Sequence, residues 1–362
     1  MSSSNEERRL RVIVLCLEWP RIGRHTGGVG RYAARLVDAL SRVCEVEVVA
    51  YDDADMNLAP RAALWGVPPP RSRFARYYTD PVRAARVVRR RHADVVHSHG
   101  DDWALLLARR RLRIVRTFYG SGLGEALGGG SVVRRLNHVV LFGLELLSRA
   151  RIRTRVAIGP DSLRTFSCQH VIPPVVPSPT TQPASAESFP RERAVAFIGA
   201  FDGRKRGWLA QETWRQVQET EPDVALRVVG APDDRENFDA DVHFSAGPTD
   251  EEVQALLARS MVLIVPSTYE GFGIPMWEAL CQGTPVVATG NPGSAWQARH
   301  ARGGVFLAED DELAGKVCDL LKSPAAWAAA STRARDGGRR ISDLADPSRY
   351  LEIYRRVVNG VG

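Results

Sequence analysis

The chain has little lysine and no cysteine framework. Only 3 of its 49 Lys and Arg residues are lysine, so arginine supplies almost all of the positive charge. The five cysteines are widely spaced and form no CxxC pair, which argues against disulfides and for a reducing compartment. No apolar run approaches the roughly 18 residues that cross a membrane, and acids precede the first apolar run, unlike a signal peptide. These absences favour a soluble, cytoplasmic protein.

The composition that is present is that of a globular protein. The chain has 362 residues, of which 44% are hydrophobic and 25% charged, and this length favours two domains. Residues 1–180 hold 29 arginines against 16 acids, so this half carries +13 and the remainder −6. The positive charge of residues 1–180 raises the possibility of a nucleic-acid partner. However, their arginine clusters lack interleaved aromatics and no nucleic-acid module is present, so we expect no nucleic-acid partner.

Strand and helix patterns alternate along both halves. In the first half we expect strands at 11–17, 45–50, 93–97 and 113–117, and a helix at 29–41. After a proline-rich stretch we expect strands at 194–199, 225–230, 242–244, 261–266 and 285–288, and helices at 208–220, 250–258 and 347–358. Such alternation predicts an α/β protein of two doubly wound, Rossmann-like domains that face each other across a cleft.

The same patterns give domain boundaries. We expect an N-terminal, acceptor-side domain over 1–176, a proline-rich linker over 177–190 and a C-terminal, nucleotide-sugar-binding domain over 191–345. The last residues, 346–362, form an amphipathic helix that can pack back on the N-terminal domain.

A glycine-rich segment, Gly27-Gly28-Val29-Gly30, precedes the first predicted helix. It fits the GxGxxA dinucleotide fingerprint, with Asp52 about 20 residues on, so a nicotinamide-dependent enzyme that uses the Gly28 and Gly30 loop is one alternative. In that motif, however, the glycines follow the strand almost at once, whereas here residues 19–26 intervene. In either case the exposed N–H groups of a helix N-terminus suit a phosphate.

A second glycine-rich segment, EGFGIPMWEAL at 270–280, follows the strand at 261–266 and is itself followed by GTPVVA. Pro275 is a residue favoured in the first turn of a helix, so Glu270 lies in the loop and Glu278 on the helix. The helix N-terminus favours an anion, and the two carboxylates can accept hydrogen bonds from hydroxyls. A site with both properties suits a sugar phosphate.

This segment resembles the EGFGIPxxEALxxGxPVVA signature of the family 4 retaining glycosyltransferases, which have the GT-B fold. Glu270 and Glu278 meet its E-x7-E spacing, and GGVGRY and DVVHSH (94–99) resemble its N-terminal motifs. The resemblance implies transfer of a sugar from a nucleoside diphosphate sugar to an acceptor hydroxyl with retention of anomeric configuration. It implies no metal and no cofactor. The acceptor would be a small molecule, a glycan or a lipid-linked molecule.

The resemblance also implies roles for single residues. Glu270 would contact donor-sugar hydroxyls, Glu278 would hold the nucleotide ribose, and Gly28 would approach the diphosphate from the other domain. Backbone amides of the loop would face the sugar and the diphosphate: Phe272, Gly273 and Ile274.

The chain departs from the family pattern at two places. The family's diphosphate-binding Arg is Ala200 here and its Lys is Arg206, but Arg204, Lys205 and Arg206 still supply three cations for the diphosphate. The family's His after the fourth strand is Tyr119, which cannot gain a positive charge near neutral pH. The His is then dispensable, the sugar presents another group, or catalysis is impaired. A non-catalytic relative that binds nucleotide sugars is therefore the other alternative.

The end of the strand at 93–97 gives the remaining candidates. His97 and His99 form an HxH pair with no further ligand to complete a metal site, so His99 is assigned, with Glu270 and Tyr119, to the candidate catalytic residues. Asp101, Asp102 and Trp103 either line the acceptor pocket or form a solvated turn. The arginine clusters of the N-terminal domain are either solvated or a lipid-facing patch for peripheral contact at the inner membrane face.

Overall fold

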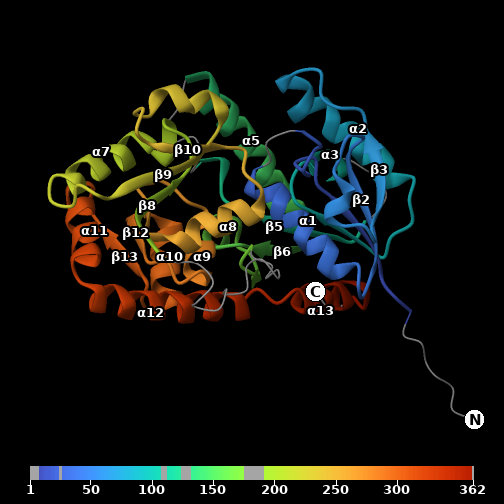
Figure 1. The fold of residues 1–362 in the computed structure, drawn as a ribbon. Coiled ribbons are helices and arrows are strands. Elements are labelled where there is room, and N and C mark those ends of the chain that lie inside the picture. Colours follow the sequence, from blue (N-terminus) through green and yellow to red (C-terminus); the bar gives the residue numbers. More distant parts are fainter. Residues whose placement is uncertain (1–7, 24–26, 107–111, 124–131, 175–190, 361–362) are drawn as a thin grey trace, which may run out of the picture.

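The computed structural model describes residues 8–23, 27–106, 112–123, 132–174 and 191–360. It contains two parallel β-sheets, each covered by helices on both faces, which lie side by side (Figure 1). The predicted α/β fold of two Rossmann-like units is confirmed. The whole predicted linker, residues 177–190, lies outside the described part of the chain, as do three residues of the arginine clusters, Arg109, Arg110 and Arg111.

The N-terminal sheet has the strand order β3-β2-β1-β4-β5-β6-β7, with every pair parallel. Its strands are β1 (Arg11–Leu15), β2 (Glu45–Tyr51), β3 (Ala63–Val67), β4 (Val95–Ser98), β5 (Ile114–Phe118), β6 (Thr154–Ala157) and β7 (His170–Val171). Its helices are α1 (Gly28–Leu40), α2 (Asp80–Arg89), α3 (Trp103–Leu106), α5 (Val132–Arg151) and α6 (Pro160–Phe166), with a π-helical turn η2 (Ala75–Thr79).

Alternation along β1 explains how both faces of this sheet are buried. Val12 and Val14 pack in one apolar cluster with α1, whereas Ile13 and Leu15 pack in another with α2 and α3. Successive side chains of a strand point to opposite faces, so the continuous apolar run RVIVL supplies two cores at once.

The C-terminal sheet has the strand order β10-β9-β8-β11-β12-β13, again parallel throughout. Its strands are β8 (Glu192–Ile198), β9 (Ala225–Gly230), β10 (His243–Ala246), β11 (Ser260–Val265), β12 (Val286–Thr289) and β13 (Val305–Ala308). Its helices are α7 (Gly207–Gln218), α8 (Asp250–Arg259), α9 (Ile274–Cys281), α10 (Pro292–Ala301), α11 (Leu313–Lys322) and α12 (Pro324–Asp343). Short 3₁₀ turns are η1 (Met56–Leu58), η4 (Gly203–Lys205), η5 (Pro232–Asn237) and η6 (Asp310–Glu312).

The last helix, α13 (Ser348–Val358), leaves the C-terminal unit and packs under the N-terminal sheet (Figure 1). Tyr350 and Tyr354 are fully buried there. The Tyr32 hydroxyl donates to Tyr350 Oη at 3.0 Å, and His97 Nδ1 and Tyr354 Oη share a hydrogen bond at 2.7 Å. A buried aromatic and histidine cluster therefore fastens the end of the chain to α1 and β4.

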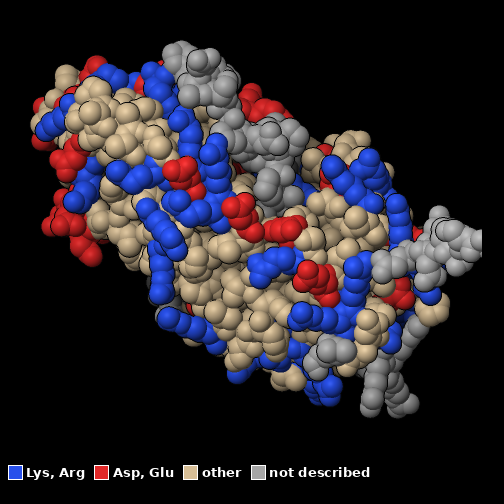
Figure 2. All heavy atoms as spheres, turned by 90° about the horizontal axis from the view of Figure 1, so that it is seen from below, with Lys and Arg blue, Asp and Glu red and all other residues tan. Residues whose placement is uncertain are grey.

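The remaining features concern the cysteines, the apolar character of the helices and the surface charge. All five cysteines are free and buried. Within the described residues, no helix combines the length and the apolar character that a bilayer crossing requires. Seen from below, Lys and Arg are spread over the surface, while Asp and Glu gather at the outer edge of the C-terminal unit (Figure 2). The sequence analysis did not anticipate β3, β6, β7 and β13.

Candidate functional site

The glycine-rich loop between β11 and α9 forms the centre of the C-terminal site. Gly273 has φ +84, a left-handed conformation that favours glycine, and a Cβ there would overlap the Met276 side chain. The amide of Gln297, on α10, donates to the carbonyl oxygens of Phe272 at 2.9 Å and Gly273 at 2.7 Å. Gln297 thus holds the loop in place, and Ile274 begins α9, where the first N–H groups have no intrahelical partner.

Glu270 is buried beside two cations. Lys205 Nζ donates to its Oε1 at 2.6 Å, and Arg204 Nη1 lies 3.3 Å from its Oε2. Burial alone would raise the pKa of Glu270, but the charges of Lys205 and Arg204 hold this pKa below its ordinary value. The carboxylate is therefore ionised at neutral pH, and the three side chains together carry one net positive charge.

Arg206 does not join this group. It is held in a left-handed backbone conformation with φ +52. Its guanidinium donates to both carboxylate oxygens of Asp310, at 2.6 and 2.9 Å, and to the carbonyl of Pro266 at 2.5 Å. The structure therefore brings two of the three predicted cations to Glu270, and the expected contact of Arg206 with a diphosphate stays a prediction.

Glu278 lies on α9 at the junction between the two units. Arg35, on α1, has its Nη1 3.6 Å from Glu278 Oε1 and its Nη2 2.5 Å from Asp250 Oδ2. Arg31 reaches the other oxygen of Asp250 at 2.9 Å. Burial and the nearby Asp250 raise the pKa of Glu278 to about 7, although Arg35 and Arg31 oppose this shift. No sequence pattern predicts this junction, because its residues come from three separate helices, α1, α8 and α9.

The two glycine-rich segments meet at the same junction. A Cβ on Gly28, the first residue of α1, would lie 3.4 Å from Ile274 Cδ1, the first residue of α9. On the other side of the loop, a Cβ on Gly271 would overlap the carbonyl oxygen of Tyr119. The N-terminal residues of two helices, one from each unit, therefore lie next to each other, and Ile274 is four residues along the chain from Glu270.

Tyr119 and His99 are hydrogen-bonded to each other through Tyr119 Oη and His99 Nδ1. Burial lowers the pKa of His99 to about 3, helped by the charge of Arg116, and burial raises the pKa of Tyr119 well above its ordinary value. Both side chains are therefore neutral near pH 7. Among the described residues, His99 Nε2 has no hydrogen-bond partner.

His99 and Tyr119 belong to a cavity of about 180 Å³ at the carboxyl ends of β1, β4 and β5. Asp101, Asp102 and Trp103 line it, and their role in an acceptor pocket stays a prediction. Six further charged or polar residues of the lining were not predicted from the sequence: Glu18, Arg76, Tyr77, Arg116, Glu145 and Ser148. In the described part of the chain, no group of three or more His, Cys, Asp and Glu could hold a metal ion.

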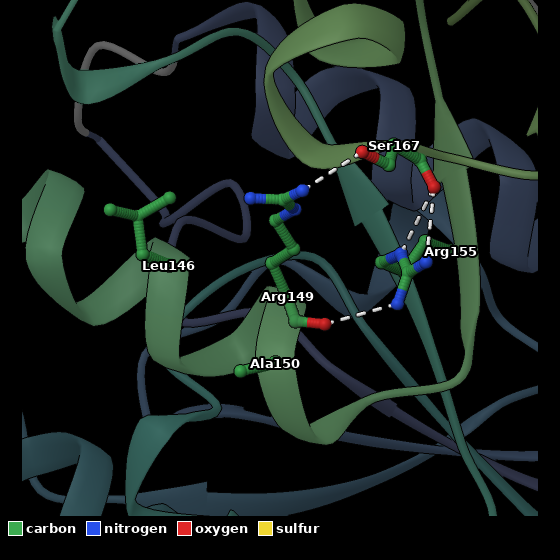
Figure 3. Close-up of a pocket in the computed structure, with 5 residues that line it drawn as sticks. All are labelled: Leu146, Arg149, Ala150, Arg155 and Ser167. Atoms are coloured by element: carbon green, nitrogen blue, oxygen red, sulfur yellow. Dashed lines mark hydrogen bonds between the residues drawn. The ribbon is translucent and has the colours of Figure 1, made fainter.

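A second hollow, between α5 and α6, is explained by the local backbone (Figure 3). Arg155 donates to the carbonyl oxygens of Arg149 and Ile152 at the end of α5, at 3.0 and 2.7 Å, and to that of Ser167. Arg149 donates to Ser167 Oγ at 3.0 Å. The Arg155 guanidinium satisfies carbonyl groups at the ends of α5 and α6, so this hollow is a helix-capping arrangement.

The fold and the meeting of two Rossmann-like units define a GT-B protein. A model described as glycosyl transferases group 1 matches residues 192–323, and one described as glycosyltransferase family 4 matches residues 26–176. The chain belongs to the GT4-like glycosyltransferases, which confirms the resemblance found in the sequence.

The chain is similar to individual proteins over part or nearly all of its length. A segment of 103 residues is 41% identical to an MMP α-(1→4)-mannosyltransferase of Mycolicibacterium hassiacum, and it covers 27% of this chain and 24% of that protein. Among solved structures, sucrose-phosphate synthase from Thermosynechococcus elongatus superposes with a TM-score of 0.77 at 20% identity, over 97% of this chain and 100% of that one. Anabaena Alr3699/HepE in complex with UDP-glucose gives a TM-score of 0.68 at 15% identity, with coverage of 97% and 100%.

Proposed function

We propose that this glycosyltransferase moves a sugar from a nucleoside diphosphate sugar to an acceptor hydroxyl, with retention at the anomeric carbon. The proposal is carried by the glycine-rich loop between β11 and α9: its Glu270 binds Lys205 and Arg204, and Ile274, at its end, lies next to Gly28 at the N-terminus of α1. Helix N-termini and cations stabilise a diphosphate. Retention follows the family resemblance.

The predicted donor residues other than Arg206 have a place in this scheme. Glu270 accepts hydrogen bonds from sugar hydroxyls, Glu278 accepts from the nucleotide ribose, and the N–H groups of Phe272, Gly273 and Ile274 face the sugar and diphosphate. Ribose binding by Glu278 requires it to exchange its contact with Arg35. The Anabaena relative was solved with UDP-glucose, which supports a uridine nucleotide as the first donor to test.

Catalysis would come from positioning and electrostatics. The net positive charge at Glu270 and the two helix ends stabilise the leaving diphosphate, so we propose that the reaction needs no metal ion. The acceptor binds in the cavity at His99 and Tyr119, with its hydroxyl directed towards Gly271. Because both His99 and Tyr119 are neutral, they orient the reactants through hydrogen bonds and supply no charge.

A calorimetric titration tests the donor assignment. UDP, GDP and ADP and their glucose and mannose derivatives are titrated into the wild type, Glu278→Ala and the control Glu251→Ala, an exposed acid on α8. We expect one nucleotide series to bind the wild type and the control, and to bind Glu278→Ala at least tenfold more weakly. Failure of every nucleotide to bind the folded wild type would overturn the proposal.

Ala200 and Tyr119 favour a second candidate, a relative that binds the nucleotide sugar without transfer. The two candidates separate once the donor is known. Release of the nucleoside diphosphate in the presence of a mixed sugar and cyclitol acceptor panel, with an added chelator, supports the metal-independent enzyme. Tight donor binding with no release in any mixture supports the non-catalytic relative.

We also propose a peripheral contact with an anionic membrane through α5. This helix exposes Leu136, Val139 and Val140, at 65%, 51% and 44%, and its C-terminal end is rich in arginine. An apolar stripe beside basic residues suits a lipid surface. Leu136→Glu with Val139→Glu should release the protein from phosphatidylglycerol vesicles, whereas Leu307→Glu, at a 42% exposed site on the other unit, should not. Equal sedimentation of all variants would contradict the contact.

A further inference from the structure

The cavity at His99 and Tyr119 is small and adjoins the donor loop. Tyr119 and Gly120 form part of its lining, and Gly271, next to Glu270, packs against them from the other unit. Its volume of about 180 Å³ is below the roughly 300 Å³ at which drug-sized pockets begin. It therefore has room for one ring or one end group of an acceptor.

The charge of its lining is negative. Arg76 Nη1 lies 2.9 Å from Asp101 Oδ1, and Arg116 Nη1 lies 2.9 Å from Asp102 Oδ1, so each arginine is already paired. Two further carboxylates line the cavity, Glu18 and Glu145. Glu18 lies 3.6 Å from Arg76, and Glu145 accepts a hydrogen bond from the backbone N–H of Gly122 at 2.9 Å. The lining thus holds two more carboxylates than guanidinium groups.

Two residues of the lining carry buried donor groups. Trp103 Nε1 and Arg116 Nε are buried N–H groups without a hydrogen-bond partner in the part of the chain that is described. Both can only donate, so an occupant must offer oxygen lone pairs. Carboxylates can only accept when ionised, so the same occupant must also offer O–H or N–H groups. A hydroxyl is both donor and acceptor, and a ring with several hydroxyls meets both demands.

We propose that this cavity selects a polyol acceptor that carries no phosphate or carboxylate group. The inference rests on the proposed function, because it names the class of acceptor for the same reaction. An anionic acceptor would meet a lining in which, among the described residues, four carboxylates face two guanidinium groups, and both guanidinium groups already contact Asp101 and Asp102. Like charges placed together in a binding site reject the wrong partner. Burial raises the pKa of Glu145 to about 6, so this carboxylate is ionised at pH 8.

Ligand-observed NMR at pH 8, without any donor, tests the selection directly. The probes are two matched pairs: glucose with glucose 6-phosphate, and myo-inositol with its 1-phosphate. We expect the neutral member of at least one pair to bind the wild type at least tenfold more tightly than its phosphate. Tighter or equal binding of the phosphates, or binding of neither neutral polyol, would overturn the proposal.

Glu145→Gln locates the selection in the cavity. Glutamine keeps an oxygen for the Gly122 N–H and removes one charge. The ratio of the affinity for the neutral polyol to the affinity for its phosphate should therefore fall at least threefold. Glu352→Gln, an exposed acid on α13, is the control and should leave the preference unchanged. Should Glu145→Gln fail to fold, Glu18→Gln replaces it with the same expectation. An unchanged preference in the folded variant counts against the proposal.

The nucleotide titration keeps the two proposals distinguishable. Nucleotide binding without the polyol preference leaves the donor assignment standing and rejects only the acceptor class. Polyol preference without any nucleotide binding rejects the donor assignment, and the cavity is then a polyol site in its own right.

Discussion

The two halves of the molecule carry charges opposite to those of the sites that they contain. Residues 1–180 hold +13, yet the cavity in this half is lined by more carboxylates than arginines. The remainder holds −6, yet its glycine-rich loop faces Lys205 and Arg204. Net charge describes the solvated surface, whereas a site depends on a few side chains held at short distances. Under the proposed function, the C-terminal site thus favours an anionic donor and the N-terminal cavity disfavours an anionic acceptor.

The largest effect should come from Glu270, which tests whether the donor side depends on this one carboxylate. Glu270→Gln removes the charge that holds Lys205 and Arg204, and it halves the capacity to accept from sugar hydroxyls. We expect kcat/KM for the donor to fall about 100- to 1000-fold, as measured by nucleotide release.

The acceptor side should not respond to the same change. Neutral polyols should bind Glu270→Gln as they bind the wild type, and the control Glu251→Gln should keep its turnover. Turnover of Glu270→Gln within threefold of the wild type would show that the cation–carboxylate cluster is structural only.

The next effect concerns Glu278 and its dependence on pH. Its folded pKa is about 7, above the ordinary 4.5, because burial disfavours the charged form. Between these values the folded state retains a proton that the unfolded state has lost, so the free energy of unfolding falls as pH rises from about 4.5 to 7 and then levels. Glu278→Gln has no such loss. Relative to the wild type, its stability in urea should improve by up to about 3 kcal/mol from pH 4.5 to pH 8.

The contrast with Glu270 sharpens the comparison. The pKa of Glu270 is lowered by cations, so its contribution to stability is present above its unfolded pKa and is lost only as the pH falls through the folded value. Glu270→Gln should therefore show no relative gain between pH 4.5 and 8. A gain of equal size in both variants would contradict the difference between the two carboxylates.

The loop and helix of the candidate donor site could be predicted from the sequence because they are continuous along the chain. Residues 270–280 run through one loop and one helix, and β8 and β11 are neighbours in the sheet. The carboxyl ends of neighbouring parallel strands lie together, which brings Lys205 to Glu270. The exception is Arg206, whose left-handed backbone turns its side chain to Asp310. No sequence pattern predicts a left-handed backbone conformation at an arginine.

The acceptor side could not be predicted to the same extent. The charged residues of the cavity come from five separate segments. Glu18 follows β1 and Asp101 follows β4, whereas Arg76 lies in η2, Arg116 in β5 and Glu145 in α5. Only the order of the strands in the sheet brings these segments together. The hydrogen bond between His97 and Tyr354 likewise depends on α13 packing against the N-terminal unit. The apolar periodicity of α13 predicts a helix but not the position of that helix in the fold.

A steric change tests whether the two sites must touch. Gly271→Ala places a Cβ against the carbonyl oxygen of Tyr119, so the donor loop and the cavity wall must separate. We expect transfer to fall about tenfold, equivalent to about 1.4 kcal/mol, while nucleotide binding stays within threefold. Gly315→Ala, on α11, has no heavy atom within 4 Å of the added Cβ and should leave transfer unchanged. Equal transfer by the two variants would indicate that the reactants do not meet at this contact.

The smallest effect should come from the ion pair of Arg31 and Asp250, which joins the two units across the junction. Both side chains are about one-third exposed, so solvent screens the pair and its energy should be below about 1 kcal/mol. A double-mutant cycle of Arg31→Gln and Asp250→Asn should give a coupling of a few tenths of a kcal/mol that vanishes in about 1 M salt. The pair of Arg42 and Asp38 joins α1 to the turn that directly follows it, within one unit. It should couple as weakly in stability and leave the KM for the donor unchanged, whereas Arg31→Gln should shift that KM by a few fold. Identical KM values for the Arg31 and Arg42 variants would mean that the ion pair at the junction does not affect donor binding.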